Sequence, residues 1–80
     1  MRVEVSRQDI ERGRPRQVWC CPIALALERQ TGRSFAILND EIEDDQSRTY
    51  PLPIEAQEFV ARFDQGHLVD PITFELLYQL

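Results

Sequence analysis

The stretch VWCCPIALALERQTG, residues 18–32, predicts a short and largely buried helix. Pro22 suits the first turn of a helix, where its missing N–H leaves no hydrogen bond unmade, and the residues that follow are strong helix formers. Gly32 ends the run. Because the segment 22–31 is apolar around most of its circumference, we expect the helix to be enclosed by the rest of the chain.

Short strands are predicted on both sides of this helix. RVEV, residues 2–5, alternates apolar and charged side chains with the period of a half-buried strand. SRQDIERG follows as a helical turn that begins at the Ser6 cap and ends at Gly13. Beyond the helix, two or three antiparallel strands are predicted by β-favouring segments that turn-prone residues separate, at 35–38, 41–43 and 48–50.

A second helix is predicted by PIEAQEFVARFDQG, residues 53–66. Its apolar side chains recur at i, i+3, i+4 and i+7, which is the spacing of one helix face. These side chains are Ala56, Phe59, Val60 and Phe63. Gly66 supplies the C-terminal stop.

The tail DPITFELLYQL, residues 70–80, fits two structures. Ile72, Phe74 and Leu76 alternate as in a strand, whereas Asp70 and Pro71 resemble the cap and first residue of a helix. We favour a strand at 72–76 and keep the helix as the alternative.

This order, β-α-β-β-(β)-α-β, predicts a small single α+β domain over residues 1–80, with a mainly antiparallel sheet and two helices on one face. A chain of 80 residues has a thin core, so self-association would stabilise it. No apolar run approaches the roughly 18–20 residues that cross a bilayer, and the first residues lack the apolar middle of a signal peptide. We therefore expect a cytoplasmic protein without a membrane partner.

The two cysteines, Cys20 and Cys21, are neighbours, which excludes a disulfide framework. A thiol just before a helix could have a lowered pKa and be nucleophilic, or it could pack in the core together with Trp19. We favour packing, and we expect no enzyme activity and no cofactor.

A metal site is also not expected. The cysteine pair lacks the usual two-residue spacing of zinc ligands, and the chain has one histidine. Asp64, His67 and Asp70 are spaced by three, but Gly66 interrupts the helix between them. The ordinary interpretation is a helix C-terminus, where His67 lies near the last carbonyls.

Charge is divided unequally along the chain, whose net charge is −5 and which contains no lysine. Residues 1–33 hold seven arginines against four acids, and residues 34–80 hold two arginines against ten acids. Arginines cluster in RQDIERGRPR, which predicts a mobile basic loop able to hold a phosphate or carboxylate through Arg7, Arg12, Arg14 and Arg16. Nucleic acid is a poor partner, because the net field is repulsive and no exposed aromatic alternates with the arginines.

Acids cluster in NDEIEDDQ, which predicts a solvated hairpin or a docking patch for a basic protein, formed by Asp40, Glu41, Glu43, Asp44 and Asp45. Calcium binding is not expected, since the ligand spacing and the glycine of a calcium loop are missing. Pairing of this hairpin with the arginine-rich loop, within one chain or across a dimer, would explain both clusters. In a symmetric homodimer the apolar end of the chain would be covered at Leu77, Tyr78 and Leu80; otherwise it would dock a partner.

Two segments resemble a family of small uncharacterised bacteriophage and prophage proteins: CPIALAL, residues 21–27, and LPIEAQEFVARFDQGHLVDPITFEL, residues 52–76. That family pairs a CP[IV]ALAL helix start with a later F[IV]xxFDxG and a closing PxxFxL. The resemblance implies a phage origin and supplies no catalytic residues. We predict a non-enzymatic interaction protein that binds and modulates a host factor, of host defence or transcription for example, in the host cytoplasm. The alternative is a small-ligand binder that captures an anionic metabolite or signalling nucleotide with the arginine-rich loop.

Overall fold

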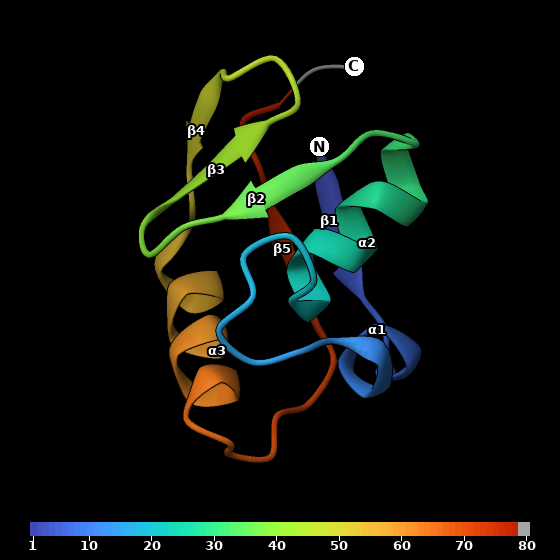
Figure 1. Cartoon of the computed structure of the whole chain (residues 1–80), viewed down its shortest axis with the longest axis vertical. Helices are drawn as coiled ribbons and strands as arrows, with labels where there is room; N and C mark the ends of the chain where they lie inside the picture. Colours follow the sequence, from blue (N-terminus) through green and yellow to red (C-terminus); the bar gives the residue numbers. More distant parts are fainter. Residues whose placement is uncertain (79–80) are drawn as a thin grey trace.

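The helix expected at residues 22–31 is α2 (Pro22–Thr31) of a computed structural model that describes residues 1–78. The other elements are β1 (Arg2–Val5), α1 (Arg7–Arg12), β2 (Phe35–Ile37), β3 (Glu41–Asp44), β4 (Thr49–Pro51), α3 (Ile54–Asp64) and β5 (Ile72–Glu75). Figure 1 shows α2 and α3 apart from each other, with β5 passing between them and β3 and β4 above α3. The predicted α+β class and the strand at the C-terminal end are confirmed.

The strands form two antiparallel sheets, where the sequence predicts one. β1 pairs with β5, and β2, β3 and β4 form a three-stranded meander. One edge of each sheet is already bonded to another segment. The Gln30 side chain accepts a hydrogen bond from the Glu4 N–H at 2.7 Å and donates one to the Arg2 carbonyl at 2.9 Å. The Ile37 N–H donates to the Val18 carbonyl at 2.9 Å, so a loop lies where another strand could have paired with β2.

The helices differ in the strands that they contact. α2 packs against both β1 and β2, and α3 packs against β5. A third helix, α1, packs against α2. The Asp9 carboxylate fixes this contact, because it accepts hydrogen bonds from the Ser6 N–H at 2.8 Å and from the Arg29 guanidinium at 2.9 Å.

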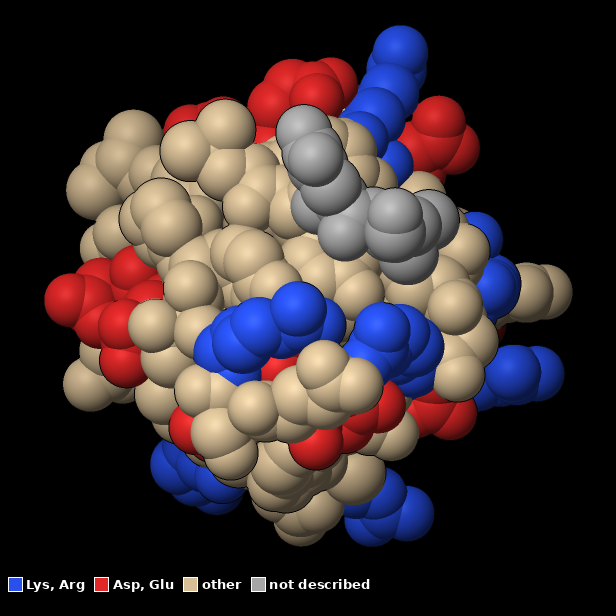
Figure 2. Space-filling model, turned by 90° about the horizontal axis from the view of Figure 1, so that it is seen from above, with Lys and Arg blue, Asp and Glu red and all other residues tan. Residues whose placement is uncertain are grey.

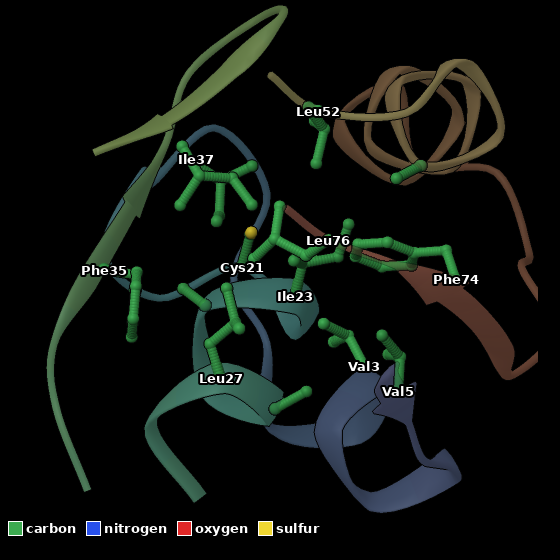
Figure 3. Close-up of a cluster of buried hydrophobic side chains, with 14 of the residues drawn as sticks. Val3, Val5, Cys21, Ile23, Leu27, Phe35, Ile37, Leu52, Phe74 and Leu76 are labelled. Carbon is green, nitrogen blue, oxygen red and sulfur yellow. The ribbon is translucent and has the colours of Figure 1, made fainter. Parts of the chain in front are cut away.

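The core fills the space between α2, α3 and the two sheets. Figure 3 shows its side chains converging from β1, α2, β2, β5 and the segment before α3. Val3 of β1 lies opposite Phe74 of β5, and both are buried. Ala56, Phe59 and Phe63 of α3 are buried as the periodicity predicts.

Two glycines are required by the path of the backbone. Gly32 ends α2 in the left-handed conformation, with φ of 75°, and its N–H donates to the Glu28 carbonyl. A Cβ at Gly13 would lie 2.6 Å from the Pro22 ring, so only glycine allows the end of α1 to approach the start of α2 this closely. This contact brings the two ends of the intervening loop together.

Replacement of Phe59 by alanine should lower the free energy of unfolding by about 3–5 kcal/mol, because a buried aromatic side chain would leave a cavity. This is a large share of the stability of a small domain. The measurement is urea denaturation followed by circular dichroism. Leu68→Ala is the matched control, since the Leu68 side chain is 94% exposed and its loss should leave the midpoint nearly unchanged. Equal midpoints for Phe59→Ala and the wild type would contradict this packing of α3.

Candidate functional site

The segment between α1 and α2 forms a closed loop that we call the Trp19 loop, residues 14–20. The Arg14 N–H donates to the Cys20 carbonyl at 2.9 Å and closes its two ends. Within the loop, the Cys20 N–H donates to the Gln17 carbonyl at 3.0 Å. The backbone therefore turns back on itself and presents residues 15–19 away from its base.

The Trp19 loop is attached to two other elements. The Val18 carbonyl accepts the Ile37 N–H of β2, and Arg16 binds the last residue of α3. The Arg16 N–H donates to Asp64 Oδ1 at 2.9 Å, and its Nη1 donates to the Asp64 carbonyl at 2.9 Å. Arg16 has a φ of 61°, in the left-handed region that is unfavourable for arginine, and these bonds stabilise it there. Hydrogen bonds thus tie the Trp19 loop to β2 and to the end of α3.

Apolar side chains are exposed at the end of this loop. Trp19 is 49% exposed and Val18 is 40% exposed. Val18 also lines a cavity of about 380 Å³ between the loop, β2 and α3, together with Arg16, Gln17, Cys21, Ile37, Leu38, Asn39, Val60 and Asp64.

The sequence predicts that Trp19 packs in the core, and this is wrong. The sequence does carry a signal of this exposure. Residues 12–17, which precede Trp19, are polar, glycine or proline, so they supply no apolar partner at strand or helix spacing.

The two cysteines have different environments. Cys21 caps the start of α2, and its sulfur points into the core (Figure 3). Burial raises the pKa of the Cys21 thiol to about 11. At neutral pH this thiol is protonated and enclosed, which matches the predicted packing. Cys20 is half-buried.

The four arginines of the predicted anion site do not converge. Arg7, in the first turn of α1, donates to the Val69 carbonyl at 3.3 Å and lies 3.5 Å from Asp70. Arg12 lines a different hollow, between α1 and α2, and Arg16 is bonded to Asp64. Arg14 is an exposed residue at the base of the Trp19 loop. A phosphate cradle that uses all four side chains is therefore not formed.

Asp44 is buried, so its assignment to an acidic docking patch is wrong. Its carboxylate accepts hydrogen bonds from the Gln46 and Arg48 N–H groups at 2.9 Å each, from Arg48 Nε at 3.0 Å and from the Tyr50 hydroxyl at 3.2 Å. Burial alone would raise the pKa of Asp44, but these donors lower it to about 2. The residue closes the turn between β3 and β4 and is not available to a partner.

The rest of the acidic hairpin pairs differently from the prediction. Asp45 accepts a hydrogen bond from Arg33 at 2.9 Å, so the hairpin's ion pairs are with Arg33 and Arg48 and not with the arginine-rich loop. Asp40 is exposed, and Glu41 and Glu43 are half-buried. On the face drawn in Figure 2, arginine and acidic side chains lie interspersed and are not separated into halves.

The C-terminal segment lies beside β1, where Met1 N donates to the Leu76 carbonyl at 2.7 Å. Tyr78 is buried, with ring centroids 5.3 Å from Phe35 and 5.0 Å from Tyr50, so the prediction that a second copy covers it is wrong. Leu77 is 79% exposed, and Leu80 lies outside the described residues. A homodimer stays a prediction, with Leu77 as an exposed apolar group.

Comparison of the chain with protein-family models, with curated proteins and with solved structures returns no match. Within residues 1–78, no helix is long and apolar enough to span a membrane. In the same range, His, Cys, Asp and Glu side chains do not gather in a group of three that could hold a metal ion.

The Asp44 carboxylate should make stability depend on pH. Its pKa is about 2 in the fold against an ordinary value of 3.8, so its contribution is fully present above about pH 5 and is lost as the pH falls through 2. The stability difference between the wild type and Asp44→Asn should therefore shrink as the pH falls from about 5 to 2. Urea unfolding at several pH values measures it.

Asp70→Asn is the control for this experiment. The Asp70 side chain is 97% exposed, so this variant should differ little from the wild type at any pH. A difference between Asp44→Asn and the wild type that stays constant down to about pH 2 would show that the ionised carboxylate is not what stabilises the turn.

Cys21 should resist iodoacetamide in the folded protein at neutral pH, because the thiol is buried and protonated. The Cys20→Ser variant leaves Cys21 as its only thiol. Mass spectrometry should show this variant unmodified when folded and modified in concentrated urea at the same pH. Equally rapid modification in both conditions would contradict the packing of Cys21.

Proposed function

We propose that this protein is a small non-enzymatic binding domain that engages a protein partner with the Trp19 loop. The observation that carries the proposal is the half-exposed Trp19 on a loop fixed at its base and on two sides. The resemblance to phage proteins supports the further proposal that the partner is a host protein, which the domain binds in the host cytoplasm and modulates.

The chemistry of the loop supports protein recognition. Tryptophan is enriched among the residues that dominate binding energy at protein interfaces, and burial of its exposed half would favour association. Because hydrogen bonds already hold the loop, binding would require little further ordering of the backbone. Val18 and the adjacent cavity offer an apolar recess beside Trp19 for a side chain of the partner.

The alternative function, capture of an anionic metabolite or signalling nucleotide, has less support. Two of the four arginines on which it depends, Arg7 and Arg16, are bonded to Asp70 and Asp64 within the chain. A ligand that used both guanidinium groups would have to displace the Asp70 carboxylate from Arg7 and the Asp64 backbone carbonyl from Arg16.

Trp19 is the only tryptophan of the chain, so its fluorescence reports directly on the proposed contact. A host protein recovered on the immobilised domain should shift the emission of Trp19 to shorter wavelength and protect it from acrylamide. Trp19→Ala should weaken affinity for that protein by about 30-fold, as loss of about 2 kcal/mol at an interface hot spot implies.

Ile54→Ala is the matched control, since it removes an exposed apolar side chain elsewhere on the surface. It should retain the partner with an affinity within about two-fold of the wild type. Equal affinities for Trp19→Ala and the wild type, or a partner that leaves the Trp19 emission unchanged, would refute the proposal.

A further inference from the structure

A second hollow, of about 320 Å³, lies between α3 and the segment that leads into β5. We call it the α3 groove. Its lining consists of Glu55, Glu58, Phe59, Arg62, Leu68, Val69, Asp70 and Ile72. None of these residues lines the cavity beside the Trp19 loop.

The inner part of the α3 groove is apolar. Phe59 is buried, and Val69 and Ile72 are half-buried. Leu68 is almost completely exposed. A large apolar side chain in this groove would contact carbon on more than one side and would remove Leu68 from water.

The rim of the α3 groove is acidic. Glu55 and Glu58 are exposed on α3, and Asp70 is exposed on the opposite wall. Arg62 is the basic residue of the lining, and Arg7 lies 3.5 Å from Asp70. With Asp70 beside Arg7, the rim still has Glu55 and Glu58 against Arg62, and the whole chain carries a net charge of −5.

We propose that the α3 groove binds a basic amphipathic segment of a protein partner. A leucine, methionine or phenylalanine of that segment occupies the apolar floor, and flanking lysines or arginines lie over Glu55 and Glu58. Apolar burial supplies most of the affinity, and complementary charge orients the segment and speeds association. An acidic segment would be repelled by the same rim.

The α3 groove is separate from the surface of the proposed function. Residues along a helix are rotated by about 100° each, so Val60 and Asp64 share one side of α3, and Glu55, Glu58 and Arg62 share another. The Trp19 loop lies on the first side and the groove on the second. The inference therefore does not depend on what binds Trp19.

The probe is a fluorescein-labelled peptide of about 12 residues, with two leucines one helical turn apart among lysines, arginines and alanines. Fluorescence anisotropy should give saturable, micromolar binding to the full chain. A peptide with both leucines replaced by serine should bind at least about ten-fold more weakly. The affinity of the leucine peptide should fall between about 0.05 and 0.5 M salt.

Two variants test the groove, and one matched pair controls for net charge. Glu55→Gln with Glu58→Gln should weaken binding by about five-fold, and Leu68→Ser by about ten-fold. Glu11→Gln with Glu28→Gln removes the same charge from exposed positions of α1 and α2 and should change binding less than about two-fold. The substituted groove residues are exposed, so thermal unfolding should show that these variants fold.

Four results, besides loss of peptide binding in Trp19→Ala, would overturn the proposal. They are absence of saturable binding, equal binding of the serine peptide, equal weakening by the two glutamine pairs, and a dimer of the free chain that Leu68→Ser dissociates. Trp19→Ala should bind the peptide as the wild type does. Loss of peptide binding in Trp19→Ala would place the peptide on the Trp19 surface, which refutes the groove while it leaves the proposed function standing.

Discussion

Burial of α2 against both sheets is the constraint on which the rest of the structure depends. This one helix contacts α1, β1 and β2, so it joins a sheet made by the chain ends to a sheet made by its middle. The Gln30 side chain, in its last turn, makes the hydrogen bonds with the β1 backbone that a neighbouring strand would otherwise make. At its start, the contact of Pro22 with Gly13 brings the ends of the preceding loop together, and Trp19 of that loop is half-exposed.

Many charged side chains of this protein bind other groups of the same chain. Asp9 joins α1 to α2 through Arg29, Asp44 closes the hairpin through Arg48, and Asp64 holds Arg16. Paired carboxylates of this kind stabilise turns and helix contacts when backbone N–H groups share them. Arg7 pairs with Asp70 and Arg33 pairs with Asp45, so the two charged halves of the sequence are interleaved in space.

The local elements could be predicted from the sequence because short-range rules decide them. The helix at 22–31 follows from a first-turn proline and a terminal glycine, and the strand at the C-terminal end follows from alternation. The division into two sheets could not be predicted, since it depends on the Gln30 side chain and the Val18 carbonyl, which meet their strands only after folding. The sequence of the acidic segment also does not show which of its acids is buried, so Asp44 could not be distinguished from its exposed neighbours.

α3 shows how a domain of 80 residues can present the two proposed binding surfaces. Its buried stripe fixes the helix, which leaves one flank beside the Trp19 loop and the other in the groove. Asp64, the last residue of α3, also supports the Trp19 loop, because its hydrogen bonds with Arg16 hold the loop to the end of this helix. The two surfaces thus share a scaffold but no lining residue, so a substitution in one can leave the geometry of the other intact.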